Sequence, residues 1–400
     1  MSPGGRRQGR RGERRLALLA LPALVFVVLC FFWPVSRFLL LAVDNSELSV
    51  GLAHTVAVLK AAPTGAPDEA AYAALVADLA TARAIKQDAL IAQALNQRLV
   101  GTRFLVLKTA RDAAAGAFAA PFKESVLAKY PDWAAPEIWR VIGGQGARYT
   151  GYHMLASLDL RRDASGQIVQ APPEESIFRR MLLRTLWIST AVTLLCAALA
   201  LPISQAIVSA APVWRRVLFA LVLFPLWSSL LVRTVIWIIV LQRNGPVNAS
   251  LVFLGIVDEP VSLIYTRFSL YLAMIQVLLP LMILSVVSVM QRVPANYMKA
   301  ALSLGAPWLT AWRTVQLPLV LPGILAGGAI VFVFSIGYYI TPVLVGGPSD
   351  QMISSMIAFY TNETLNWNLA AALSIQVLFL VIIMAALVMT VRALTARRPA

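Results

Sequence analysis

The side chains that most often catalyse reactions or bind metals are few and scattered in this sequence. Cys30 and Cys196 both lie in apolar runs, which is typical of small packing residues rather than of a disulfide or a metal pair. His54 and His153 are isolated from each other and from both cysteines, so the sequence predicts no metal site. The Walker A, HExxH and GxSxG patterns do not occur. We therefore expect no catalytic residue, no cofactor and no enzymatic activity in this chain.

Three other side chains are candidates for lining a path through the molecule. Arg233 is the one charge deep inside an apolar run, where an ionised group costs at least about 2.5 kcal/mol. We expect it to face a bundle interior as a structural or gating group; the alternative is that it snorkels to the outer end of its helix. Tyr338 and Tyr339 could offer aromatic faces to an alkylammonium ion, and the alternative is that they are ordinary interfacial aromatics.

A loop in the C-terminal half contains residues that typically start and end helices, and their spacing predicts two short helices. Pro294 suits the start of the first helix, and Gly305 stands where a helix end favours a residue without a Cβ atom. Pro307 then begins a second helix, which we expect Pro318 to stop. Two neighbouring alanines give the first helix a low-relief surface that could enter a groove on a partner. The alternative is a simple amphipathic connector.

These residues sit in a chain whose composition requires lipid as its solvent. The sequence is 59% hydrophobic and only 13% charged, with a mean hydropathy of +0.74, whereas soluble domains are about 25% charged. A membrane-spanning helix needs about 20 predominantly apolar residues. Six runs qualify, at 16–43, 185–208, 217–241, 268–290, 319–345 and 370–391.

The segment 44–178, between the first and second runs, is polar and Ala-rich and holds most of the acidic residues. Its stretches 69–98 and 103–118 place apolar residues at helical spacing, so we expect a mostly helical extramembrane domain. The run that begins at residue 16 is longer than the hydrophobic part of a signal peptide, and we expect it to be an uncleaved first span. The fold class is therefore an all-α membrane protein with a large helical insertion, followed by a five-helix core at 179–400.

The positions of Lys and Arg predict the orientation in the membrane. With the N-terminus inside, the cytoplasmic segments hold fourteen basic residues and one acid, Glu13, so they carry +13 of the net charge of +15. The segment 44–178 holds thirteen basic and fourteen acidic residues and would lie outside. We therefore expect both termini in the cytoplasm. The cytoplasmic segments are 1–15, 211–216, 291–318 and 392–400.

The spacing within the loop resembles the EAA motif of ABC-importer permeases, which covers about twenty residues. The positions in register are Ala300, Ala301, Gly305, Val315, Leu317 and Pro318. Lys299 stands where that family usually has Glu, so the acidic contact of the family is not expected at this position, and the partner surface could carry a matching acid. The resemblance implies that the loop is a coupling helix that docks into a separate ATPase subunit. The location of the basic residues beside apolar runs indicates a lipid bilayer as partner and not nucleic acid.

More of the chain is similar to the permeases of spermidine/putrescine-type importers, over roughly residues 180–395 and the first span. The segments that carry this similarity are 230–234, 243–248, 337–348 and 351–366. The resemblance implies six spans of the type I importer kind, a second permease subunit that is either homologous or identical, and a periplasmic substrate-binding protein in a bacterial inner membrane. It also implies a small solute, such as a polyamine or similar organic cation. Related branches carry other small cations, anions or opine-like compounds.

Two other function classes, a secondary transporter and a membrane sensor, have less support from the sequence. A secondary transporter normally has more spans, inverted halves and intramembrane acids, and a membrane sensor reading a ligand through 44–178 needs a cytoplasmic signalling domain. The acids of the short outer loops could attract a cation, but solvated loop charges are the ordinary interpretation. These acids are Asp258, Glu259, Asp350 and Glu363.

Overall fold

The structure is a computed structural model that describes residues 21–61, 67–144, 146–163, 167–174, 176–294 and 296–396. The predicted 1–15 tail and the first five residues of the 16–43 run lie outside the described residues. Within them, six helices are long and apolar enough to cross a membrane, as predicted. These spans are Leu21–Leu40, Phe178–Ser209, Leu230–Phe253, Arg267–Met290, Trp308–Ile336 and Trp367–Val391.

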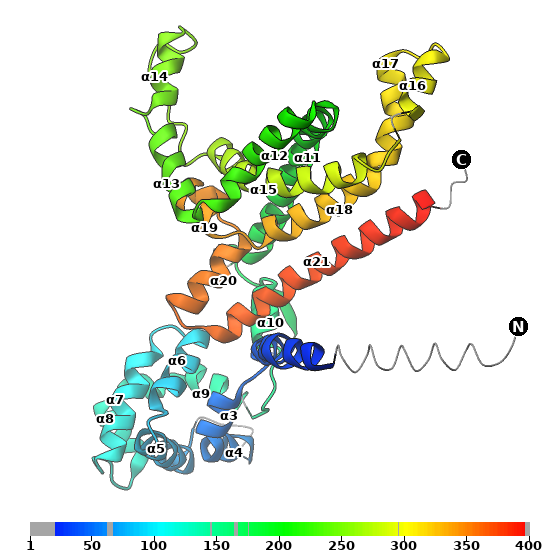
Figure 1. Cartoon of the computed structure of the whole chain (residues 1–400). Helices are drawn as coiled ribbons and strands as arrows, with labels where there is room; N and C mark the ends of the chain where they lie inside the picture. Colours follow the sequence, from blue (N-terminus) through cyan, green and yellow to red (C-terminus); the bar gives the residue numbers. More distant parts are fainter. Residues whose placement is uncertain are drawn as a thin grey trace, which may run out of the picture. The chain divides into compact units, whose positions relative to one another are not determined.

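The chain divides into two compact units (Figure 1). Unit 1 comprises the residues up to 156 together with 366–372, and unit 2 comprises 157–365 and the remainder. Unit 1 begins with the first span, Leu21–Leu40, and continues into a domain of short helices. Its elements are η1 (Val28–Phe32), α2 (Trp33–Leu40), α3 (Ser46–Gly51), α4 (Ala53–Ala61), α5 (Glu69–Ala84), α6 (Asp88–Arg98), α7 (Thr102–Ala114), α8 (Phe122–Lys129), η2 (Pro131–Ala134), α9 (Pro136–Gly143) and α10 (Tyr152–Ser157).

The short helices of unit 1 enclose a core of their own. Asp68 caps α5 by accepting a hydrogen bond from the Ala71 amide at 2.9 Å. Trp133 is fully buried, and its indole Nε1 donates to Thr109 Oγ1 at 2.9 Å while its carbonyl accepts from the Tyr72 hydroxyl at 3.0 Å. Lys86 has φ +59° and separates α5 from α6, so the predicted helical stretch 69–98 is two helices. The predicted mostly helical domain is confirmed.

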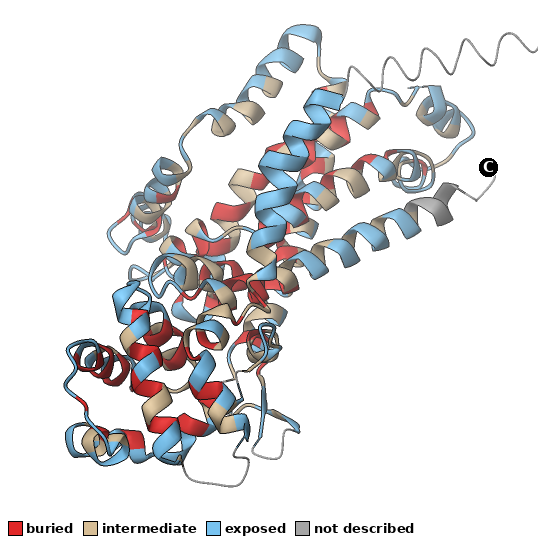
Figure 2. Cartoon of the chain, turned by 90° about the horizontal axis from the view of Figure 1, so that it is seen from below, coloured by how far each residue is buried: buried red, intermediate tan, exposed pale blue. Residues whose placement is uncertain are grey.

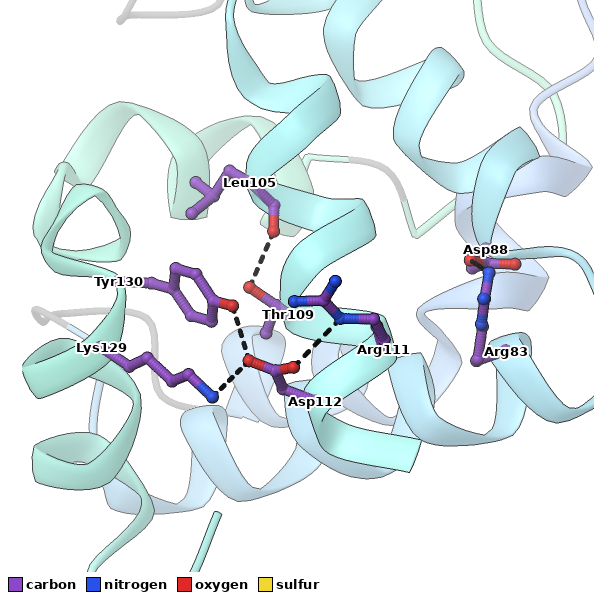
Figure 3. Close-up of polar contacts among 8 residues, drawn as sticks. All are labelled: Arg83, Asp88, Leu105, Thr109, Arg111, Asp112, Lys129 and Tyr130. Atoms are coloured by element: carbon purple, nitrogen blue, oxygen red, sulfur yellow. Dashed lines mark hydrogen bonds and ion pairs between the residues drawn. The ribbon is translucent and has the colours of Figure 1, made fainter. Parts of the chain in front are cut away.

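A polar cluster joins α7 to α8 on the surface of this core (Figure 3). The Asp112 carboxylate accepts from Tyr130 Oη at 2.6 Å and from Arg111 Nε at 3.3 Å, and Lys129 Nζ lies 2.5 Å away. The hydrogen bond of Lys129, followed by those of Tyr130 and Arg111, lowers the Asp112 pKa to about 2. Asp112 is therefore ionised at neutral pH and ties the two helices together.

Unit 2 contains the remaining spans and the loops between them. Its elements are β1 (Leu160–Arg162), β2 (Ile168–Gln170), α11 (Phe178–Ser209), α12 (Pro212–Trp227), α13 (Leu230–Leu241), α14 (Pro246–Phe253), α15 (Arg267–Met290), α16 (Asn296–Ser303), α17 (Trp308–Ala311), η3 (Trp312–Gln316), α18 (Leu317–Ile336), α19 (Ile340–Val345), η4 (Pro348–Asp350), α20 (Ile353–Asn362) and most of α21 (Trp367–Ala396). The antiparallel hairpin of β1 and β2 is a small exception to the all-α prediction.

The spans α11, α15 and α18 pack against one another and form the core of unit 2. Close approach of α18 to α15 requires small residues: a Cβ atom added at Gly327 would lie 2.7 Å from Met282 Sδ and 2.9 Å from Ser285 Cβ. Buried positions follow the facing sides of these helices, whereas long stretches of the membrane helices are exposed (Figure 2). Such exposed apolar stretches are available to lipid or to partner subunits.

The predicted third span, 217–241, is wrong in its boundaries. The helix breaks at Ser228 and Ser229, which have extended backbones between α12 and α13. Pro225 lies in the last turn of α12, and a proline inside a helix removes a backbone donor and favours a kink or an end. The span consists instead of α13 and α14, Leu230–Phe253. Hydropathy alone missed the break because both sides of it are apolar.

The predicted fifth span, 319–345, is also displaced. Pro318 does not stop the preceding helix: α17, the π-helix η3 and α18 run on continuously as Trp308–Ile336. The wider π turn leads directly into the first turn of α18, where the Leu317 amide donates to the Trp312 carbonyl, and a proline is tolerated in such a first turn. The segment after Gly337 is a separate short helix, α19.

Candidate coupling loop and polar site of the membrane unit

The predicted docking loop forms a helix pair carried at the end of α18 (Figure 1). Gly305 has φ +85°, the left-handed conformation that ends a helix. Its amide donates to the Leu302 carbonyl at 3.0 Å, and the Ala306 amide donates to the Ala301 carbonyl at 3.2 Å. These two hydrogen bonds define a Schellman motif, the helix ending that favours glycine at this position. The glycine predicted at a helix end therefore adopts the expected backbone conformation.

The pair presents an exposed apolar surface outside the spans. Leu304 is 89% exposed, and Tyr297, Trp308 and Leu309 are each more than half exposed. The Trp308 and Trp312 rings stack with centroids 6.4 Å apart. Sequence reasoning selected the alanines and missed these large side chains, although an unusual number of apolar residues in a loop was a usable signal.

The seven residues of the motif divide between two parts of the loop. Lys299 and Ala300 are exposed on α16, and Ala301 is half-buried beside the turn at Gly305. The other three, Val315, Leu317 and Pro318, lie on η3 and the first turn of α18, and α16 packs against η3. Gln316 Nε2 in η3 donates to Gln205 Oε1 of α11, which fastens the loop to the core.

Arg233 lies in the first turn of α13, next to the helix break. Its Nη2 donates to the Ser228 carbonyl at 3.1 Å. Its Nε and Nη1 are shielded from solvent and have no hydrogen-bond partner within the described residues. The guanidinium therefore turns toward the break and not toward the end at Leu241, which lies about 12 Å away by helical rise. Two shielded N–H donors and a helix N-terminus together favour negative charge or oxygen acceptors at this point.

The structure brings Tyr338 near Arg233 and places Tyr339 elsewhere. Burial raises the pKa of the Tyr338 hydroxyl, and Thr341 and then the charge of Arg233 act in the opposite direction. The Tyr338 carbonyl accepts from Ser354 Oγ at 2.7 Å. Tyr339 is 43% exposed and lines an open groove of about 430 Å³ between α19 and α20. The groove also holds Phe359, Asn362 and Glu363. Of the three residues predicted to line one path, Arg233 and Tyr338 belong to the site at the helix break, and Tyr339 belongs to the groove between α19 and α20.

Asp350 corrects one interpretation of the short outer loops. Its carboxylate is 3% exposed and accepts from Arg267 Nε at 2.7 Å. It is therefore a buried partner that fixes the start of α15 and not a solvated loop charge. Asp258 and Glu259 are exposed, as the ordinary interpretation of loop charges predicts.

The C-terminal half of the chain, which contains the coupling loop and Arg233, is similar to known proteins. Residues 198–399 match the family model described as "Binding-protein-dependent transport system inner membrane component". The spermidine/putrescine transport system permease protein PotB of Escherichia coli K12 is 27% identical over 201 residues, which cover 50% of this chain and 73% of PotB. The inner membrane ABC transporter permease protein YdcU of the same organism is 30% identical over 215 residues, covering 50% of this chain and 68% of YdcU.

A third relative is named for a different cargo. The molybdenum transport system permease protein ModB of Mycobacterium bovis is 28% identical over 215 residues, covering 54% of this chain and 78% of ModB. The family model, six spans and these relatives agree with one another. The chain belongs to the binding-protein-dependent transport system inner membrane components, and is a multi-pass permease subunit of an ABC importer.

Proposed function

We propose that this permease imports a polyamine or a similar small organic cation across a bacterial inner membrane. The resemblance to spermidine/putrescine permeases supports this class, and PotB carries spermidine and putrescine in its name. The groove beside Tyr339 offers aromatic surface and one carboxylate, Glu363, which suit an alkyl chain bearing an ammonium group. Tyr338 and Arg233 would form the neighbouring part of the translocation path.

The observation that carries the transport mechanism is the exposed helix pair at Gly305. We assign Lys299, Ala300, Ala301, Gly305, Val315, Leu317 and Pro318 to coupling with an ATPase subunit. The small residues of α16 allow a partner groove to approach closely, and the exposed Leu304 and Trp308 supply apolar area to bury. ATP binding would close the ATPase pair, move the docked helices and turn the bundle outward. ATP hydrolysis would occur in that separate subunit.

The remaining assembly follows from the same assignment. A second permease subunit, homologous or identical, would complete the path, and a periplasmic binding protein would deliver the solute. The excess of +13 on the proposed inner segments supports cytoplasmic termini and an external insertion at 44–178, followed by the core at 179–400.

Arg233 favours a second candidate cargo, a small oxyanion. Its two shielded N–H donors have no partner in the described part of the chain and match anion chemistry. The percentage identity to a molybdenum permease is comparable to that to PotB. For a cationic cargo, Arg233 would act in this part of the path as a structural or gating group and would not be a direct ligand of the solute.

Uptake separates the two candidates. Cells that lack their own polyamine and molybdate importers would express the permease with its ATPase and binding protein. Radiolabelled putrescine, spermidine and molybdate would each be supplied under the same conditions. Accumulation of either polyamine supports the proposal, and accumulation of molybdate alone overturns it in favour of the anion.

A further inference from the structure

A pocket in unit 1 lies where the first span ends and the last span begins. It encloses about 390 Å³. Its lining includes two arginines, one carboxylate and three aromatic rings: Arg37, Phe38, Asp44, Arg148, Tyr149 and Trp367. Nothing in the transport assignment uses it.

Three segments far apart in the sequence build this pocket. The Asn45 amide donates to the Arg148 carbonyl and the Thr150 amide donates to the Val43 carbonyl, both at 2.8 Å. The Asn368 side chain donates to the Asp44 carbonyl at 3.0 Å. The Phe38 and Trp367 rings meet edge to face with centroids 6.2 Å apart. The site is therefore held by backbone pairing and not by a chance encounter of side chains.

The charge of the pocket favours an anion. Neither Arg37 nor Arg148 has an ion pair within the described residues, and both are exposed. The Arg148 guanidinium lies over the Tyr149 ring, with its Cζ 5.9 Å from the ring centroid. The Asp44 carboxylate already accepts from the Ser46 amide and hydroxyl, both at 3.1 Å. The pocket lining thus holds two guanidinium groups without an ion pair within the described residues and one carboxylate that is already hydrogen-bonded.

The location identifies the anion. Arg37 stands three residues before the end of the span Leu21–Leu40, and Trp367 is the first residue of the span Trp367–Val391. The pocket therefore lies at one membrane–water interface, where aromatic rings and arginines are enriched. The outer face of the first span is apolar and exposed, including Phe32 at 56% and Val35 at 40%. A diacyl lipid could lay its chains there while its headgroup reaches the arginines.

We infer that this pocket binds the phosphodiester of a membrane phospholipid, with Arg37 and Arg148 as its two ligands. The planar guanidinium fork matches phosphate oxygens in a bidentate geometry. The inference needs only that the two spans cross a bilayer, and it holds for either orientation and either cargo.

Native mass spectrometry of the delipidated full-length protein tests the inference. The probes are phosphatidylethanolamine, phosphatidylglycerol and diacylglycerol, which lacks the phosphodiester. We expect adducts with both phospholipids and not with diacylglycerol. Arg37→Gln and Arg148→Gln should each weaken the phospholipid adduct about fivefold, since each removes hydrogen bonding to the phosphodiester, and one such bond contributes roughly that factor. Arg103→Gln, an exposed arginine on α7, is the matched control and should leave binding unchanged.

Three results would overturn the inference. Equal adducts with diacylglycerol would show that the chains and not the phosphodiester are recognised. Unchanged binding in both single variants would remove the arginines from the site. Displacement of the lipid by an equal concentration of soluble glycerophosphoethanolamine would identify a soluble phosphodiester as the ligand. The two variants are separate, so the misfolding of one leaves the other as a test, and size-exclusion elution reports folding.

Discussion

Replacing Gly305 should uncouple the transporter without unfolding it. The residue holds φ +85° in the Schellman motif, and a Cβ atom added there would meet nothing within 4 Å. Within the isolated chain, Gly305→Asp therefore costs only backbone strain, about 1–2 kcal/mol. If the docked loop must keep this turn, the same energy weakens ATPase binding about 5- to 30-fold. A carboxylate buried without a partner at the interface would add to the loss.

Gly116 supplies a closely matched control in the insertion. It has φ +68°, it also has nothing within 4 Å of an added Cβ, and it ends α7 in the same hydrogen-bond pattern: its amide donates to Ala113 and the Ala117 amide donates to Asp112. Gly116→Asp imposes a similar local strain far along the chain from the coupling loop. Any difference between the two variants therefore reports the function of the loop.

The assay is co-purification of the ATPase with each variant, together with ATP hydrolysis stimulated by the loaded binding protein. We expect Gly305→Asp to lose both and Gly116→Asp to keep both, at equal levels of permease in the membrane. Wild-type retention and stimulation in Gly305→Asp would mean that the loop is only a connector. Equal loss in both variants would refute the reasoning in another way, by tracing the effect to strain alone.

Three further predictions concern the membrane site, the insertion and the topology. Arg233→Leu should reduce uptake at unchanged levels of permease in the membrane, and Arg233→Lys should recover little of it. The control Arg243→Leu, at an exposed arginine, should have no effect on uptake. Normal transport by both Arg233 variants would remove Arg233 from the path. Asp112→Asn should lower the local stability of α7 and α8 by about 1–2 kcal/mol in hydrogen exchange, whereas the exposed Asp132→Asn should not. Because the Asp112 pKa is about 2 in the folded chain and higher when unfolded, its contribution to stability is full above about pH 4 and is lost as the pH falls through 2. A difference between wild type and variant that does not shrink between pH 4 and pH 2 would contradict the assignment. In a background with Cys30 and Cys196 replaced, a cysteine at Leu90 should react with an impermeant thiol reagent on intact spheroplasts and one at Ser303 should not; the reverse pattern would invert the proposed topology.

The sequence predicted the features that depend on local chemistry. Gly305 was identifiable because a helix end with positive φ selects glycine, and the position of that glycine defines the loop. The insertion was identifiable because its apolar residues recur at helical spacing, which hydrophobic packing then fixes. The six spans were found because length and hydropathy are direct requirements of the bilayer.

The features that depend on long-range pairing or on small backbone preferences were not predictable. The break at Ser228 and Ser229 lies inside a uniformly apolar run, so hydropathy passes through it. Pro318 was interpreted as a helix stop because the π turn before it leaves no simple sequence signal. Asp350 was interpreted as solvated because its partner, Arg267, lies 83 residues away. Each error arose where a long-range contact or a local backbone conformation, and not the local composition, determines the structure.

The central claim is that this chain is the permease of an importer driven by ATP through a separate subunit. The direct measurement is solute uptake into proteoliposomes containing the permease, its ATPase and any partner permease, with the loaded binding protein on one side and ATP on the other. The account predicts uptake that requires all of these components and stops when ATP is omitted. Uptake by the permease alone, driven by a proton or sodium gradient without ATP, would contradict it and identify a secondary transporter.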